Sequence, residues 1–180
     1  FLKKSNLPYL ATWATIDLFR DDEPNFAGSF GVSSTRPGNF VVQNSDLIIS
    51  LGARLDTHEV GSNASKFAPL AKKVVIDIDS SELSKDNGMV TDLKFCCDLK
   101  DFLEVMNSKA IQTQKLEPWM KKIADWRGKY PACLQEYYGQ KDTVNPYVLM
   151  EELSKKVEED SIVIPDAGGN LTWTMQAFKV

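Results

Sequence analysis

Short apolar runs separated by longer polar stretches are the main pattern of this sequence. Residues 7–12, 46–51 and 73–79 are largely apolar, and residues 89–93 form a weaker run of the same kind. Runs of this length predict β-strands, and continuous rather than alternating apolarity is typical of parallel strands covered on both faces. Helices or long loops are expected between them, so the fold class predicted is α/β with a parallel sheet.

The stretches between these runs differ in character. Residues 35–44 predict a helix, and residues 98–110 predict an amphipathic one, because apolar side chains recur at i, i+3, i+4 and i+7 from Leu99. Residues 13–34 are rich in Gly, Ser, Asp, Asn and Pro, and they predict a long loop.

The pattern changes after residue 110. Residues 111–115 read as a polar linker, and we place a domain boundary near residue 112. An aromatic-rich helix is predicted over residues 118–138, with a break at Pro131. The expected organisation therefore has three regions, which are residues 1–111, 112–142 and 143–180.

The last region begins with a strong helix signal. Asn145-Pro146 favours a helix start, because Asn can accept the first free N–H groups and Pro fits the first helical position. Leu149 and Leu153 are expected on the buried face of this helix. Residues 161–165 predict a strand, and residues 166–170 predict a tight turn at its carboxyl end.

Composition narrows the classes of function. The chain has 21 Lys and Arg against 25 Asp and Glu, a net charge of −4, which argues against a protein that binds nucleic acid through its phosphates. No apolar run approaches the roughly 20 residues of a membrane helix. Three cysteines without a CxxC pair and a single histidine argue against a zinc site and fit a reduced, cytoplasmic protein. Phe1 stands where an initiator Met is expected, so we interpret the chain as a fragment of a longer one.

Glycines and charged residues gather where the predicted strands end, which is where open α/β sheets bind ligands. The glycine-rich stretch 28–35 can bring backbone N–H groups close to a diphosphate. Arg54 can pair with phosphate, and an acid in Asp77-Ile78-Asp79 can accept ribose hydroxyls. Together they outline a dinucleotide site, although the GxGxxG pattern is absent.

The same residues also have purely structural explanations, which stay open. Glycines can serve turns, aspartates can cap helices, and opposite charges can form a surface ion pair. These explanations apply to Gly28 and Gly31, to Asp79 and Asp98, and to Arg54 with Asp56, respectively. His58 is most simply explained as a solvated loop residue.

Several segments, in order, resemble the central domain of thiamine diphosphate-dependent enzymes, in particular the acetolactate synthase large subunits. They are Leu7-Pro8 before Thr12, Gly28-x-x-Gly31, Asn39 to Leu47, Gly52-Ala53-Arg54-Leu55-Asp56 and Ile76-Asp77-Ile78-Asp79. Farther on, the Trp119 to Pro131 stretch resembles the family's linker helix. The stretch from Asn145-Pro146 to Asp166-Ala167-Gly168 resembles the opening of its diphosphate-binding domain.

The resemblance implies a Rossmann-like central domain that is truncated at its N-terminus, a linker, and the first elements of a second α/β domain. Central domains of this family bind FAD, ADP or no ligand. The matching cofactor-binding positions are Thr12, Trp13, Phe30, Gly31, Val32, Ser33, Gly52, Ala53, Arg54, Leu55, Asp56, Asp77, Ile78, Asp98 and Leu99. Gly169 and Asn170 match a Gln-His pair that reaches the thiamine diphosphate in the synthases.

Three departures from the synthase pattern bear on the FAD site or on the substrate, the first on the FAD site and the other two on the substrate. The synthases have Met-His-Gly-Thr where this chain has Val32-Ser33-Ser34-Thr35, and Asp-Asp-Arg where it has Asp56-Thr57-His58. His58 cannot present the guanidinium fork that binds substrate in the synthases. Gly169-Asn170 in place of Gln-His points the same way. We therefore expect a synthase-like relative that acts on another 2-oxo acid or acyl acceptor.

For the longer parent enzyme the resemblance implies thiamine diphosphate, Mg²⁺, a 2-oxo acid substrate, and a homodimer or homotetramer. Its reaction would be decarboxylation followed by carboligation. The family's activating glutamate and its Gly-Asp-Gly…Asn metal motif do not occur in these 180 residues. We therefore expect no catalytic or metal-binding residue here, and no activity from this chain alone. Two alternatives stay open: a non-catalytic module that binds FAD or ADP, and a protease-resistant structural core without ligand.

Overall fold

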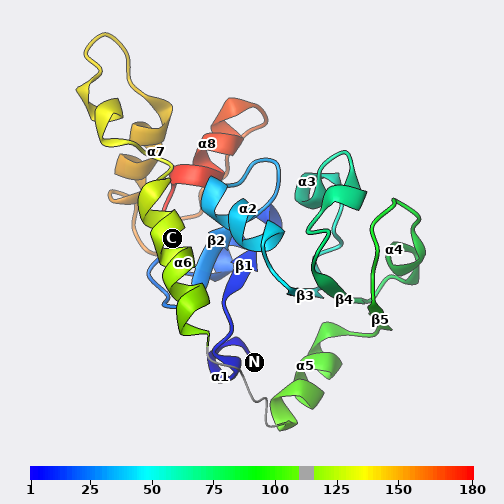
Figure 1. The fold of residues 1–180 in the computed structure, drawn as a ribbon. Helices are drawn as coiled ribbons and strands as arrows, with labels where there is room; N and C mark the ends of the chain where they lie inside the picture. Colours follow the sequence, from blue (N-terminus) through cyan, green and yellow to red (C-terminus); the bar gives the residue numbers. More distant parts are fainter. Residues whose placement is uncertain (110–115) are drawn as a thin grey trace.

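The computed structural model describes residues 1–109 and 116–180, which form helices around two parallel sheets (Figure 1). Helix α1 (Leu2–Ser5) leads into β1 (Tyr9–Ala11), and the 3₁₀ helix η1 (Trp13–Leu18) leads on to β2 (Phe26–Ser29). β1 and β2 pair in parallel.

Strand β2 lies inside the stretch for which a long loop was predicted, so that prediction was wrong for residues 26–29. Phe-Ala-Gly-Ser has no β-branched residue and gives little local strand signal. Burial forms the strand instead, since Phe26 and Ala27 are 3% and 1% exposed. Helix α2 (Arg36–Gln43) follows and confirms the helix predicted there.

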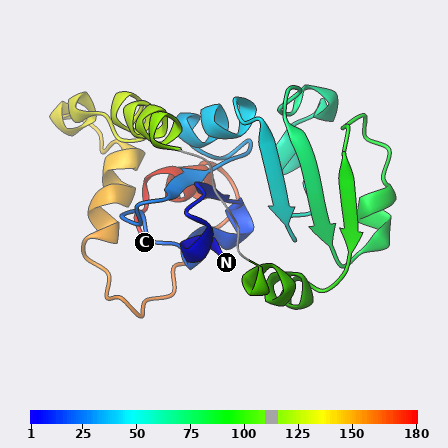
Figure 2. The same cartoon turned by 60° about the horizontal axis from the view of Figure 1, so that its bottom comes forward.

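The second sheet has the order β3-β4-β5, and all its pairs are parallel (Figure 2). Its strands are β3 (Leu47–Leu51), β4 (Lys72–Asp77) and β5 (Leu93–Cys96). Helix α3 (Thr57–Val60) and the 3₁₀ helix η2 (Ala64–Lys66) connect the first two strands, and α4 (Ser80–Ser84) connects the last two. The α/β class and the parallel sheet are therefore confirmed.

The weak strand predicted at residues 89–93 forms farther along the chain. Pairing with β4 sets its position, because Val74 faces Leu93 and Asp77 faces Cys96. Met89 packs instead against the hydrophobic core between the sheet and its helices. Sequence pattern alone does not contain this register.

The expectation that the sheet is covered on both faces holds only in part. Val75 and Leu83 pack in the core on one face, and Ile76 on the opposite face is 0% exposed. Leu47 and Leu93 lie on the same face as Ile76 and are 50% and 55% exposed. Consecutive right-handed crossovers that advance in one direction place their helices on the same side. The chain exposes 11785 Å², compared with about 8,800 Å² for a typical monomer of this mass.

Helix α5 (Leu99–Ser108) ends the first region and lies near the carboxyl ends of β3, β4 and β5 (Figure 2). Helix α6 (Glu117–Lys129) packs against α2 and β2 through Ile123, which meets Ala27 and Val41. The helix ends before Pro131, as predicted, and the 3₁₀ helix η3 (Gln135–Gly139) follows. The domain boundary predicted near residue 112 lies outside the described residues.

The chain closes with α7 (Pro146–Ser154) and α8 (Gly169–Ala177). Asn145 caps α7 by accepting from the Tyr147 amide at 3.0 Å, as predicted. The buried face expected for α7 was wrong, because Leu149 and Leu153 are 49% and 39% exposed.

The strand predicted at residues 161–165 does not form. Ile162 and Ile164 are 87% and 85% exposed, and no neighbouring strand pairs with them among the residues that the structure describes. An apolar run becomes a strand only where another strand can satisfy its backbone groups. Of the turn predicted over residues 166–170, residues 167–168 form a turn, and α8 already begins at Gly169.

Candidate functional site

The carboxyl ends of the three strands β3, β4 and β5 lie at one edge of their sheet. The Gly52 amide donates to the Ile76 carbonyl at 2.9 Å, and the Cys97 amide donates to the Asp77 carbonyl at 3.2 Å. The ladder thus continues to the strand ends. It places Gly52, Ile78 and Asp98 at one edge, where parallel sheets bind ligands.

The loop after β2 is held by a side chain whose role the sequence analysis missed. Asn39, on α2, accepts from the Gly31 amide at 2.9 Å and donates to the Gly31 carbonyl at 3.0 Å. Gly31 has φ of 118°, a conformation that other residues rarely adopt. Asn39 belongs to the motif quoted for the family resemblance, but nothing local in the sequence pairs it with Gly31.

Helix α3 joins the loop after β2 to the loop after β3. The Val32 amide donates to the His58 carbonyl at 2.7 Å, and a Cβ at Gly31 would lie 2.5 Å from that same oxygen. The rings of His58 and Trp13 lie 5.7 Å apart. His58 is exposed, as expected of a solvated residue, but it lies in α3 rather than in a loop, and it contacts the segments that follow both β1 and β2.

The loop after β3 carries an unusual backbone. Gly52, Arg54 and Leu55 have φ of 61°, 60° and 49°. The Leu55 side chain is 2% exposed and belongs to the core, so only its backbone can face a ligand. The side chain of Arg54 is largely exposed at the edge of the sheet formed by the carboxyl ends of β3, β4 and β5, which we call the strand edge.

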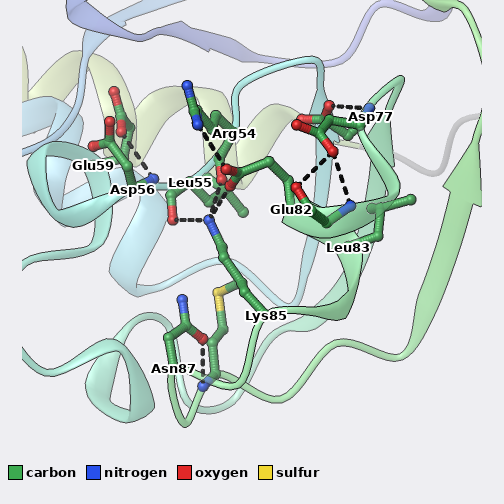
Figure 3. Close-up of polar contacts among 12 residues, drawn as sticks. Arg54, Leu55, Asp56, Glu59, Asp77, Glu82, Leu83, Lys85 and Asn87 are labelled. Carbon is green, nitrogen blue, oxygen red and sulfur yellow. Dashed lines mark hydrogen bonds and ion pairs between the residues drawn. The ribbon is translucent and has the colours of Figure 1, made fainter.

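Arg54 pairs with Glu82 of α4 rather than with Asp56, as Figure 3 shows. The guanidinium lies 2.9 Å from one carboxylate oxygen, and Lys85 lies 2.7 Å from the other. Hydrogen bonds from Lys85 and Arg54 keep the pKa of Glu82 below its usual value. The ion pair expected between Arg54 and Asp56 was thus assigned to the wrong acid.

The capping explanation for the strand-end aspartates is confirmed. Asp79 and Asp98 accept from the amides of Ser81 and Lys100 at 2.9 Å and 2.7 Å. These bonds satisfy free N–H groups at the starts of α4 and α5. A role of Asp98 in binding a cofactor stays a prediction.

Asp56 forms a capping box with Glu59 at the start of α3. The Asp56 carboxylate accepts from the His58 amide at 2.7 Å, and the Glu59 side chain accepts from the Asp56 amide at 3.1 Å. Glu59 is buried, and this burial, followed by the interaction of its side chain with the Asp56 carboxyl, raises its pKa to about 7, although the bond from the Asp56 amide acts in the opposite direction. The same interaction between the two side chains lowers the pKa of Asp56.

The proposed cofactor positions divide into buried and open ones. Thr12, Phe30 and Asp77 are each 8% exposed, and Asp77 accepts from the Asp79 amide at 2.9 Å. Trp13, Val32 and Ile78 are 42%, 68% and 70% exposed. Of the remaining positions, Gly52 and Asp98 are exposed, and Ser33, Ala53, Asp56 and Leu99 are half-buried.

The open positions fit a nucleotide chemically. Exposed apolar side chains can cover a flat ring, and backbone N–H groups at positive-φ turns can approach phosphates. A Cβ at Gly52 would lie 3.8 Å from a Leu99 side-chain carbon, so the strand edge there is closely bordered by α5.

The residues matched to thiamine diphosphate contacts lie elsewhere. Gly169 and Asn170 occupy the first turn of α8, where the Asn170 side chain accepts from the Leu171 amide at 3.0 Å. The other end of α8 reaches the loop after β2, since Gln176 donates to the carbonyls of Ser33 and Ser34 at 3.2 Å. This link was not predicted.

Within residues 1–109 and 116–180, no group of three or more His, Cys, Asp or Glu side chains could hold a metal ion, so the residues present do not fit Mg²⁺. No helix in these ranges has the length and apolarity needed to cross a bilayer.

A cavity of about 210 Å³, which the sequence analysis did not predict, is lined in part by Gly28, Ser29 and Thr35 of the glycine-rich stretch, but by no residue of the loops after β3, β4 and β5. It is lined by segments of η1, β2, α6, α7 and α8, with Asp21, Arg127, Glu151 and Lys179 among its charged residues. Burial raises the pKa of Asp21. Lys179 lies 3.2 Å from Glu151, so these two charges are paired with each other.

The fold and the strand-edge loops together define a parallel α/β domain of the type that carries ligands at its strand ends. The sequence profile described as "Thiamine pyrophosphate enzyme, central domain" matches residues 1–106, and the chain belongs to this family.

Curated relatives extend the likeness over nearly the whole chain. It is 27% identical to the acetolactate synthase isozyme 1 large subunit of Escherichia coli K12, over 99% of this chain and 30% of that protein. It is 28% identical to the mitochondrial acetolactate synthase catalytic subunit of Saccharomyces cerevisiae, over 96% of this chain and 26% of that protein. The chain thus spans less than a third of the length of these relatives.

Proposed function

We propose that this chain is the central-domain part of a thiamine diphosphate-dependent enzyme that decarboxylates a 2-oxo acid and transfers the resulting carbanion. The proposal is supported by the family match and by acetolactate synthase relatives aligned over nearly all 180 residues. Thiamine diphosphate, when bound, supplies the electron sink for this chemistry. The described residues do not fit the Mg²⁺ that accompanies it, so we assign no reaction step to this chain.

Within the enzyme, the chain's own role is to bind the nucleotide part of FAD, or ADP, at the strand edge. The observation that carries this role is the convergence of three loops, which follow β1, β2 and β3 and are joined through Trp13, Val32 and His58. The adjoining Gly52–Asp56 loop offers a positive-φ backbone and the exposed guanidinium of Arg54. Exposed Ile78 lies at the neighbouring strand end.

Ligand titration of the purified chain tests this role. FAD binding is measured by quenching of flavin fluorescence, and ADP binding by calorimetry and by the shift in Tm. We expect saturable binding of at least one of the two, with a rise in Tm because the ligand binds only the folded chain. A titration without saturation for both ligands would contradict the nucleotide role.

The catalytic proposal is tested separately. The purified chain, supplied with pyruvate or another 2-oxo acid, thiamine diphosphate and Mg²⁺, is expected to release no CO₂ and to form no carboligation product. Product formed by the chain alone would contradict the assignment of the chemistry to the longer parent. For that parent we propose a homodimer or homotetramer and a cytoplasmic location.

Two other functions make different predictions. A non-catalytic nucleotide-binding module would bind FAD or ADP, and its full-length parent would lack carboligation activity. A structural core without ligand would bind neither nucleotide. We favour the enzyme part, because the alignment with the relatives extends over nearly the whole chain. The region boundaries at residues 111 and 142 remain part of this proposal.

A further inference from the structure

The loop after β3 contains two consecutive residues other than glycine in the left-handed conformation. Arg54 and Leu55 have φ of 60° and 49°. Each such residue carries a steric cost from the contact between its Cβ and its own backbone, and the cost persists only where surrounding contacts impose the conformation. The core anchors the Leu55 side chain, but burial of that side chain does not fix the backbone of Arg54.

Lys85 supplies the missing contacts from 30 residues away along the chain. Its ammonium group donates to the Arg54 carbonyl at 2.6 Å and to the Leu55 carbonyl at 3.1 Å (Figure 3). Its third hydrogen bond goes to Glu82 at 2.7 Å. A lysine has three donors, so all of them are used here.

Glu82 binds both Lys85 and the side chain of Arg54. One of its carboxylate oxygens binds the Arg54 guanidinium at 2.9 Å, and the other binds Lys85. The Glu82 side chain is 16% exposed and that of Lys85 is 27% exposed, so neither is a freely solvated surface group. The backbone of Arg54 is thus held by Lys85, while its side chain is held by Glu82.

We propose that Lys85 is a positioning residue, which holds the Gly52–Asp56 loop in the left-handed conformation that presents its backbone to a nucleotide. This inference rests on the nucleotide role proposed above. Lys85 acts through the two carbonyls that it binds and does not itself contact the ligand. Lys85 directly follows α4, in the connection from β4 to β5. Its contacts therefore tie this connection to the loop after β3.

The experiment compares Lys85→Met, Lys85→Arg and the control Lys94→Met with the unchanged chain. Lys94 donates to the carbonyl of Leu83 in α4, and this hydrogen bond does not involve the Gly52–Asp56 loop. Amide hydrogen exchange is measured at Leu55, whose N–H donates to the Ala53 carbonyl, and at Gly52, whose N–H belongs to the ladder with β4. FAD and ADP are titrated into each variant.

For Lys85→Met we expect exchange at Leu55 to rise about tenfold with exchange at Gly52 unchanged, the size expected for lost hydrogen bonds from a charged donor. Nucleotide affinity should fall about tenfold as well. Lys85→Arg should restore most of both, because a guanidinium can also donate to two carbonyls. Lys94→Met should leave both within about twofold.

The outcomes separate the two proposals. If the unchanged chain binds neither FAD nor ADP, the nucleotide role fails, and with it the ligand part of this inference, while the exchange data still test whether Lys85 holds the loop. If the unchanged chain binds and Lys85→Met binds equally well, Lys85 is not a positioning residue. Exchange that rises equally at Leu55 and Gly52, or at neither, would also overturn the inference.

Discussion

The Val32 amide donates to the His58 carbonyl at 2.7 Å, and this bond joins the loops that follow two strands of different sheets. The two residues are 26 positions apart in the sequence. Because both lie in the candidate site, the bond makes the two loops one unit rather than two independent turns. The proposed nucleotide site depends on that unit.

Gly31→Ala should disrupt the contact between these two loops. The new Cβ would lie 2.5 Å from the His58 carbonyl oxygen, and φ is 118°. We expect a loss of about 2 to 3 kcal/mol in the free energy of unfolding, measured by urea denaturation. Gly61→Ala is the control for backbone strain alone, because its φ of 77° and ψ of −177° suit glycine but no atom lies within 4 Å of the added Cβ. A loss smaller than that of Gly31→Ala, about 1 to 2 kcal/mol, is expected there, and equal losses in both variants would refute the contact.

Strain at Arg54 can be measured with a pair of substitutions. Both Arg54→Gly and Arg54→Ala remove the guanidinium that binds Glu82, but only alanine keeps the steric cost of φ at 60°. We expect the glycine variant to be more stable than the alanine variant by about 1 kcal/mol. Chemical denaturation monitored by tryptophan fluorescence gives the difference. An alanine variant as stable as the glycine variant would show that the loop is unstrained.

Glu59 should make stability depend on pH. Its pKa in the folded chain is about 7, above its ordinary value of 4.5, because the side chain is buried and interacts with the Asp56 carboxyl. Between these two values the folded chain binds more protons than the unfolded chain, so the free energy of unfolding falls as pH rises from about 4.5 to about 7.

Glu59→Gln should remove this slope, since glutamine does not titrate and can still accept from the Asp56 amide. Denaturation curves of both chains at several pH values between 4.5 and 7 provide the test. Parallel pH profiles for the two chains would contradict the assignment to Glu59. The depressed pKa of Asp56 acts in the opposite direction, and its effect lies below its ordinary value of 3.8, outside this window.

Arg127 should anchor α6 to the first sheet. Its guanidinium donates to the Phe26 carbonyl at 2.8 Å and to the Asp21 carbonyl at 2.9 Å. Arg127→Met is expected to lower the free energy of unfolding by about 2 to 3 kcal/mol, because two carbonyls lose a charged donor. The exposed Lys121 on the same helix is the control, and Lys121→Met should cost less than about 0.5 kcal/mol. Thermal denaturation that does not distinguish the two variants would argue against the anchor.

Local pattern was enough for the elements that are strongly apolar or well capped. β3 and β4 contain the apolar runs Leu-Ile-Ile and Val-Val-Ile, which predict strands. α7 begins directly after its capping residue Asn145. Local pattern failed for β2, which forms through burial of Phe26 and Ala27. It also failed for residues 161–165, which have strand composition but no strand partner in the described part of the chain. Strand formation depends on neighbours that a single stretch of sequence does not show.

The site was predictable to a similar extent. The glycines and aspartates at the strand ends were found from their place in the pattern, and the structure puts several of them at one edge. The residues that hold these loops in place were not predicted from the sequence. Asn39 hydrogen-bonds to the backbone of Gly31, and Lys85 hydrogen-bonds to the backbone of Arg54. These contacts span 8 and 31 positions, so only the folded chain brings the partners together.

The central claim is that the strand-edge loops bind a nucleotide. Its most direct test is an amide NMR titration of the ¹⁵N-labelled chain with ADP. The account predicts saturable shifts at Gly31 to Ser33, at Gly52 to Asp56 and at Ile78, with the residues around Cys133 and Lys179 unmoved. Shifts confined to the cavity near Cys133, or spectra unchanged by ADP and by FAD, would contradict it.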